Sequence, residues 1–164
     1  MIPPSFDYVA PRDLGEAVDF LEKQGDDAKI LAGGHSLIPL LRFRFANPKY
    51  LVDINHISGL DYIHESDGYL HIGSLTRYVD VETSQLIQSK YPALSDAAGH
   101  IADPLVRNLG TVGGNVCHSD PANDLPAVML ALGASMVAVG RGGERVIPAE
   151  DFFVDTFQTA LKPT

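Results

Sequence analysis

The sequence predicts an α+β fold with two lobes, a small α/β lobe at residues 1–57 and a larger α+β lobe at residues 58–164. Short apolar runs alternate with helical periodicity over the first part of the chain, which is typical of a parallel sheet with crossover helices. Hairpin signals replace that pattern after about residue 55. One glycine-rich turn lies in each lobe. A chain of 164 residues has room for one domain or two small lobes.

The first lobe is expected to alternate strands and helices in the order β-α-β-α-β. We expect strands at 6–9, 28–32 and 50–54, the second of them buried. Asp13 can cap a helix with apolar residues at the i, i+3, i+4 and i+7 positions of one face, and Gly25 ends it. Ser36 is the expected N-cap of a short helix over 37–43.

The second lobe begins with two expected strands, 60–64 and 69–73, because Asp67-Gly68 between them is a strong hairpin signal. Helical periodicity covers 78–87, 93–102 and 121–132. The segment 103–120 is expected to be a long loop, and long loops inside compact domains are usually functional. A second hairpin is expected from strands 135–139 and 144–147 around Arg141-Gly142-Gly143.

Composition excludes several classes of protein. A net charge of −9 disfavours binding to nucleic acids and to anionic membranes. The single cysteine, Cys117, excludes an internal disulfide and a four-thiolate iron–sulfur or zinc site. The six histidines lack metal-binding spacing. No export signal is visible, and the longest apolar stretch, 127–139, is too short to span a bilayer. We therefore expect a cytoplasmic protein that does not span a membrane.

The first glycine turn, Ala32-Gly33-Gly34-His35-Ser36, lies between an expected strand and an expected helix. Glycine lets the main chain approach a ligand closely. Successive N–H groups at such a turn, with the positive end of the following helix, can bind an anion, and His35 could donate to a phosphate. A purely structural strand-to-helix turn explains the same residues equally well.

The second glycine turn, residues 109–115, offers another run of amides within the expected loop. Two such turns suggest a diphosphate held between the lobes by main-chain groups. Neither the GxGxxG nor the GxxxxGK[ST] signature is present, which disfavours a Rossmann dinucleotide site and a P-loop.

Polar residues that follow the second turn have competing interpretations. Asp120 and Asp124 are helix caps in the simpler interpretation, and Asp124 accepts hydrogen bonds from ligand hydroxyls in the other. Cys117 beside His118 resembles a nucleophile pair, but Cys117 is more simply a small buried residue.

The residues Ala32-Gly33-Gly34-His35-Ser36-Leu37-Ile38-Pro39, Thr111-Val112-Gly113-Gly114-Asn115 and Asp120-Pro121-Ala122-Asn123-Asp124 together resemble the FAD motifs of molybdenum hydroxylase flavoprotein subunits. The resemblance extends over essentially the whole chain and is strongest to the medium subunits of aerobic carbon monoxide dehydrogenases. It implies a bilobal FAD-binding domain of the vanillyl-alcohol oxidase (PCMH) type, with FAD between the lobes.

The same resemblance implies which residues bind FAD, and no residue is expected to be catalytic in the sense of a nucleophile or base. The first wall would be Lys29, Leu31, Ala32, Gly33, Gly34, His35, Ser36 and Leu37. The second would be Ile101, Ala102, Gly110, Thr111, Val112, Gly113, Gly114, Asn115, Cys117, His118 and Asp124.

The implied role is electron transfer within a hetero-oligomer. A large subunit would hold the molybdenum cofactor and a small one two [2Fe–2S] clusters, whose electrons pass through FAD to an external acceptor such as a quinone. The cytoplasm, including the inner face of the cytoplasmic membrane, is the implied location. Alternatives are a flavin subunit for a purine, an aldehyde or an aromatic heterocycle, and an interaction module without flavin. Family sequences continue past the position of Thr164, so weaker FAD binding and assembly are expected of a chain that stops there.

Overall fold

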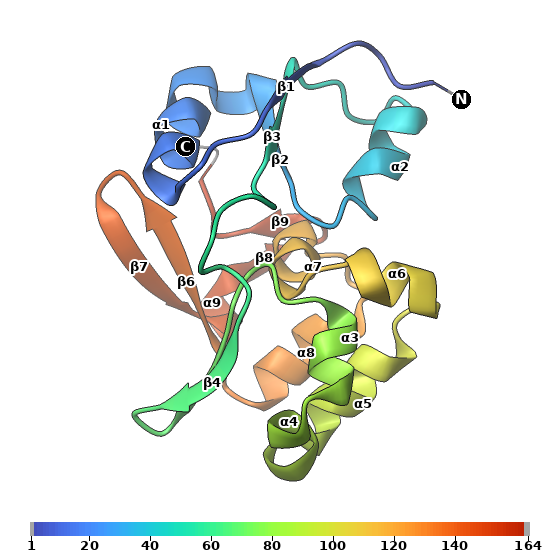
Figure 1. The fold of residues 1–164 in the computed structure, drawn as a ribbon, viewed down its shortest axis with the longest axis vertical. Helices are drawn as coiled ribbons and strands as arrows, with labels where there is room; N and C mark the ends of the chain where they lie inside the picture. The colour runs from blue at the N-terminus through green and yellow to red at the C-terminus, as the bar shows by residue number, and fades with distance from the viewer. Residues whose placement is uncertain (1, 163–164) are drawn as a thin grey trace.

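A computed structural model describes residues 2–162 (Figure 1). Met1, Pro163 and Thr164, the ends of the two expected lobes, lie outside the described residues. The elements in chain order are β1 (Asp7–Val9), α1 (Leu14–Gln24), the 3-10 turn η1 (Gly25–Asp27), β2 (Ala28–Leu31), α2 (Leu37–Arg42), β3 (Tyr50–Asp53), β4 (Ile63–Ser66), β5 (Tyr69–Ile72), α3 (Tyr78–Thr83), α4 (Gln85–Lys90), α5 (Pro92–His100), α6 (Pro104–Leu109), α7 (Val112–His118), α8 (Asp124–Ala131), β6 (Ser135–Gly140), β7 (Gly143–Pro148), α9 (Ala149–Phe152), β8 (Phe153–Asp155) and β9 (Gln158–Thr159).

The N-terminal part is the expected parallel sheet, and its strand order is β1-β3-β2. In the view of Figure 1, α1 and α2 lie on opposite sides of it. Residues 28–31 form the expected strand, but the prediction that this strand is buried is wrong. Strand β2 lies at the edge of the sheet and Ile30 is 47% exposed, because β3 takes the central place and its Val52 is fully buried.

Helix α1 begins as its sequence predicts. The Asp13 carboxylate accepts a hydrogen bond from the Glu16 amide at 2.8 Å, which satisfies one of the free N–H groups of the first turn. Gly25 ends the helix with a φ of 55°. Ser36 is the N-cap of α2 by position, but its side chain makes no capping hydrogen bond. The division into lobes at residues 57 and 58 stays a prediction.

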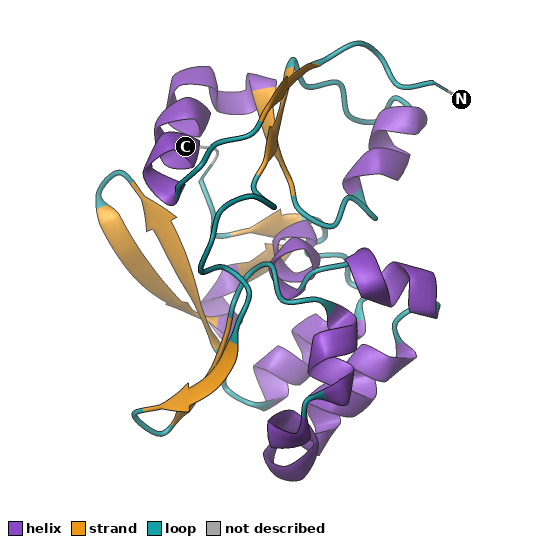
Figure 2. Ribbon diagram, viewed as in Figure 1, coloured by secondary structure: helices purple, strands orange, loops and turns teal. Residues whose placement is uncertain are grey.

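Helices α3, α4, α5 and α8, which lie at the lower right of Figure 2, contribute with α7 to one apolar core. Its buried members are Tyr78, Val81, Ile87, Leu94, Ala97, Ala98, Val112 and Leu125. The expected single helix over 78–87 is wrong, because Ser84 has extended φ and ψ of −63° and 116° and separates α3 from α4. Ser84 also caps α4, since its hydroxyl accepts a hydrogen bond from the Ile87 amide.

The segment 103–120 is not the expected loop, because it contains α6 and α7. Asp103 caps α6 by accepting from the Leu105 and Val106 amides, with Pro104 in the first helical position. The Thr111 hydroxyl caps α7. Glycine in the first turn of α7 lowers its helix propensity, but burial of Val112 and Val116 offsets that cost.

Both expected hairpins are present. In the β4–β5 hairpin Asp67 and Gly68 have φ of 53° and 82°, as a two-residue turn requires. The β6–β7 hairpin packs against a second small core made of Val116, Ile147 and Phe152. Helix α9 and the short strand pair β8–β9 were not predicted. None of the helices in residues 2–162 is both long and apolar enough to cross a membrane.

Candidate functional site

The two glycine turns touch each other. A Cβ atom on Gly33 would overlap the carbonyl oxygen of Leu109 and lie 2.9 Å from the Cα of Gly110. Real Cβ atoms essentially never come so close to backbone, so this contact requires glycine at position 33. The fold therefore brings together two motifs more than seventy residues apart, between the end of β2 and the start of α7.

The first glycine turn presents free main-chain donors. Among the described residues, the amides from Gly33 to Leu37 donate to no protein acceptor, while the Ile38 amide closes the turn on the Gly34 carbonyl at 2.8 Å. Gly34 has a φ of +76°, a conformation that L-residues rarely adopt. Consecutive free amides next to a helix start favour an anion such as a diphosphate.

His35 is exposed and already uses one ring nitrogen. Its Nδ1 lies 2.9 Å from the Gly33 carbonyl oxygen, which can only accept, so Nδ1 carries the proton. The expected hydrogen bond from His35 to a phosphate would therefore have to come from Nε2, which carries a proton only when the ring is doubly protonated.

The second glycine turn does not offer the expected row of exposed amides, and that prediction is wrong. The Val112 amide donates to the Thr76 carbonyl at 3.0 Å and the Gly113 amide to the Ser74 carbonyl at 2.9 Å. The Gly114 amide donates to the Thr111 hydroxyl at 3.1 Å. These bonds form because the segment opens α7, whose first amides need partners. The second turn thus supplies close-packed backbone, while the first supplies the donors.

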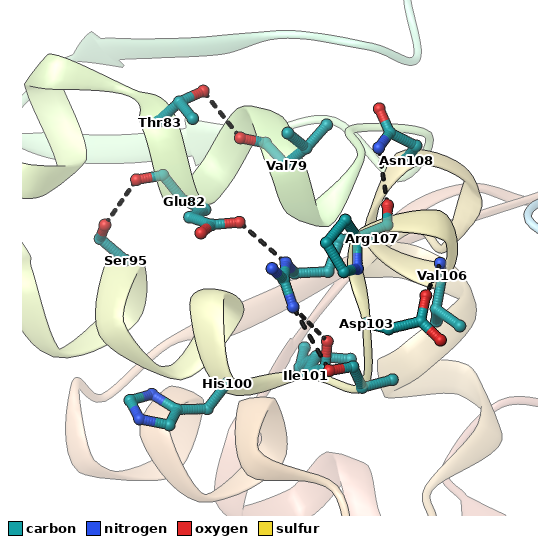
Figure 3. A network of polar contacts seen from close by, with 12 residues as sticks. Val79, Glu82, Thr83, Ser95, His100, Ile101, Asp103, Val106, Arg107 and Asn108 are labelled. Atoms are coloured by element: carbon teal, nitrogen blue, oxygen red, sulfur yellow. Dashed lines mark hydrogen bonds and ion pairs between the residues drawn. The ribbon is translucent and has the colours of Figure 1, made fainter.

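A cluster of charges and carbonyls fixes the expected site residues Ile101 and Ala102 (Figure 3). Arg107 donates to their carbonyl oxygens at 3.1 and 3.4 Å and pairs with the Glu82 carboxylate on α3 at 2.9 Å. Ala102 has a φ of +45°. This half-buried arginine therefore ties the turn after α5 to α3 and α6.

Asn115 is buried behind the second turn. Its Nδ2 donates to the Tyr78 hydroxyl at 3.0 Å, while its Oδ1 has no partner among the described residues. Burial raises the pKa of Tyr78, although the Asn115 hydrogen bond opposes the shift. The Tyr78 ring also packs on Gly110, where a Cβ would lie 2.9 Å from the ring carbon Cδ2. This pair thereby supports the second turn from the core side.

The residues that follow α7 are placed as follows. Asp120 caps a turn, accepting from the Ala122 amide at 2.9 Å, and Asp124 is an exposed residue in the first turn of α8.

Cys117 is exposed, so the prediction of a buried cysteine is wrong. Desolvation of its thiol still raises the pKa to about 11, which keeps it protonated and a poor nucleophile at neutral pH. The His118 ring lies on the ring of Phe157, with centroids 5.1 Å apart.

The remaining expected residues of the first wall lie in β2, directly after it, or at the start of α2. Lys29 and Leu31 are in the edge strand, Ala32 follows it, and Leu37 is the first residue of α2. Residues 2–162 contain no group of three or more His, Cys, Asp or Glu placed to hold a metal ion.

Sequence reasoning missed two side chains that join the turns, Asn55 and Arg77. Asn55 donates to the Ala32 carbonyl, and Arg77 donates to the Leu109 carbonyl and to Asn55. Neither belongs to a motif. The only available signal was position, since each directly follows or precedes an expected element.

Comparison with known proteins assigns the family. Residues 4–164 match the family model described as the FAD binding domain in molybdopterin dehydrogenase. The chain is 48% identical over 162 residues to the carbon monoxide dehydrogenase medium chain of Hydrogenophaga pseudoflava, covering 99% of this chain and 56% of that one. It is also 48% identical to 6-hydroxypseudooxynicotine dehydrogenase complex subunit alpha of Paenarthrobacter nicotinovorans, covering 99% of this chain and 55% of the relative.

Solved structures give the same answer for the fold. The structure of carbon monoxide dehydrogenase from Hydrogenophaga pseudoflava matches with a TM-score of 0.97 at 48% identity, over 99% of this chain and 57% of that chain. Quinoline 2-oxidoreductase from Pseudomonas putida 86 matches with a TM-score of 0.96 at 37% identity and the same two coverages. The chain spans a little more than half the length of these relatives. Its sequence and fold place it in the family of FAD-binding domains of molybdopterin dehydrogenases.

Proposed function

We propose that this chain is the FAD-binding part of the electron-transfer subunit of a molybdenum hydroxylase of the carbon monoxide dehydrogenase type. The observation that carries the proposal is the contact of the two glycine turns, with the free amides from Gly33 to Leu37 beside it. The diphosphate of FAD fits this donor set, because main-chain amides can bind phosphate without a basic side chain.

The remaining wall residues have distinct roles in this proposal. Gly33 and Gly110 keep the two walls in contact. Ser36 and Leu37 belong to the row of free amides, and Lys29, Leu31 and Ala32 precede it. Ile101 and Ala102, held by Arg107, with Thr111, Val112, Gly113, Gly114, Asn115, Cys117 and His118 form the opposite wall. Asp124 is exposed and its carboxylate is available to accept from ribose or ribityl hydroxyls.

FAD, when bound, supplies the redox chemistry, taking electrons from [2Fe–2S] clusters of a small partner subunit and passing them to an external acceptor such as a quinone. The protein residues bind and orient the cofactor, and none acts as nucleophile or base. A large partner subunit with the molybdenum cofactor would oxidise the substrate. The proposed location is the cytoplasm, including the inner face of its membrane.

A second substrate class has a specific observation in its favour. The carbon monoxide and 6-hydroxypseudooxynicotine relatives are equally similar to this chain at 48% identity, although their named substrates differ completely. A caffeine dehydrogenase subunit beta is 42% identical over 163 residues. This domain therefore does not select the substrate, and an aromatic heterocycle is the alternative to carbon monoxide.

The test is a three-subunit complex, purified after co-expression of this chain with the molybdenum and iron–sulfur subunits from the same organism. Under anaerobic conditions, carbon monoxide should bleach the visible flavin bands of the complex. A complex in which the heterocycle bleaches the flavin and carbon monoxide does not would assign the alternative. A complex that assembles without flavin would overturn the proposed function.

A further inference from the structure

We propose that Asn55 and Arg77 form a positioning clamp that fixes the spacing of the two glycine turns and thereby sets the affinity of the site for FAD. The inference rests on the proposed function and deepens it. Both residues are half-buried and lie outside the motifs, Asn55 just after β3 and Arg77 just before α3.

The two clamp residues each donate a hydrogen bond to one carbonyl oxygen next to a glycine turn. Asn55 Nδ2 donates to the Ala32 carbonyl oxygen at 3.0 Å, directly before Gly33. Arg77 Nη1 donates to the Leu109 carbonyl oxygen, directly before Gly110. Arg77 Nη2 donates to Asn55 Oδ1 at 2.8 Å, which connects the two clamp residues to each other. The Leu109 carbonyl is the same group that packs against Gly33.

Each position needs its own chemistry. Asn55 must donate to a carbonyl and accept from a guanidinium, which an amide can do and a carboxylate or an apolar group cannot. Arg77 must reach two acceptors at once, which the planar fork of a guanidinium allows and a single ammonium does not.

A carboxylate and a tyrosine hold the clamp from the sheet side. Asp53 Oδ1 accepts from the backbone N–H of Asn55 at 2.9 Å and from the side-chain Nδ2 of Asn55 at 2.6 Å. Asp53 Oδ2 accepts from the Tyr8 hydroxyl at 2.5 Å. The chain of contacts therefore runs from β1 through β3 to the turn before α7, so the sheet and the helical part share one polar network.

The experiment compares Arg77→Lys, Arg77→Met and Asn55→Asp with the original chain, and it measures two quantities. One is the dissociation constant of FAD from quenching of flavin fluorescence. The other is hydrogen–deuterium exchange without flavin at the hydrogen-bonded amides of each turn, which are Ile38 in the first turn and Val112 to Asn115 in the second. Arg141→Lys is the matched control, because Arg141 also joins distant segments, pairing with Glu22 at 2.7 Å, but touches neither turn.

The clamp predicts that all three variants bind FAD at least about tenfold more weakly, because each loses one charge-assisted hydrogen bond. Exchange should rise in both turns at once, and Arg141→Lys should change neither quantity. If Arg77→Lys binds FAD as the original chain does while Arg77→Met does not, only the charge matters and the clamp is refuted. Unchanged affinity in all variants also refutes it and leaves the proposed function intact.

Failure of the proposed function gives a different result. In that case the original chain binds no FAD at all, and the affinity part of the proposal falls with it. Exchange measured without flavin still decides the clamp, since correlated loosening of both turns supports it and unchanged exchange overturns it.

Discussion

Replacing Gly33 with alanine tests the contact on which the site is built. The new Cβ would overlap the Leu109 carbonyl oxygen and stand 2.9 Å from Gly110 Cα and 3.1 Å from the Leu109 carbonyl carbon. Ordinary contacts begin at 3.4 Å, so the two backbone segments must separate by at least about half an ångström. Both neighbours are main chain and cannot rotate away.

Such overpacking costs about 1–3 kcal/mol. If the strain is released by opening the site, FAD should bind roughly 5- to 140-fold more weakly, at about 1.4 kcal/mol per decade. If it is released within the fold, the melting temperature should fall by about 2–12 °C, at roughly 2–4 °C per kcal/mol for a chain of this size. Flavin titration and thermal melting measure the two parts.

Gly140→Ala is the control, because a Cβ there meets nothing within 4 Å. It should leave both quantities unchanged. A Gly33→Ala chain that melts and binds FAD like the original would refute the close contact of the turns, and with it the geometry of the site.

Three further outcomes are expected. Gly114→Asp should lower the affinity for FAD about tenfold at low salt, because the added carboxylate repels the phosphates. The uncharged Gly114→Asn is its control, and high salt should reduce the difference between the two variants. Equal affinities of the two variants would contradict the prediction. Tyr78→Phe leaves Asn115 Nδ2 unpaired in the core and should cost about 1–3 kcal/mol in a denaturant titration; an unchanged midpoint would contradict the buried pair. Burial alone would raise the pKa of Asp53, but hydrogen bonds from Tyr8 and from Asn55 hold it below its ordinary value of 3.8. Because its pKa is lowered in the folded state, ionised Asp53 stabilises the fold above pH 3.8, and this stabilisation is lost as the pH falls through the folded pKa. The stability lost in Tyr8→Phe at pH 7 should therefore vanish in acid. A loss of stability that is independent of pH would contradict this account.

Elements with strong local signals were predictable. The Asp13 cap, the Gly25 stop and the Asp67-Gly68 turn each depend on a few neighbouring residues, and all three are confirmed. Helix α7 was missed because Gly113 and Gly114 argue against a helix locally, and α6 was missed because it is only six residues long. Tertiary burial of Val112 and Val116 favours the helical conformation of α7, and no local pattern reports it.

The positions of the two glycine turns along the chain were predictable, but what each turn contributes to the site was not. Their contact depends on the Cα of Gly33 meeting the carbonyl of Leu109, which only the fold determines. The same holds for the amides of the second turn, which bond to carbonyls of residues 74 and 76. Asn55 and Arg77 were invisible for this reason, since their partners are distant in sequence.

The most direct test of the account is the visible absorption spectrum of the purified chain after FAD has been added and the excess removed. Bound flavin at one FAD per chain is the predicted result, with no less flavin retained by Gly140→Ala than by the original chain. A chain that circular dichroism shows to be folded, yet that retains no flavin, would contradict the claim that the two glycine turns of this domain hold FAD.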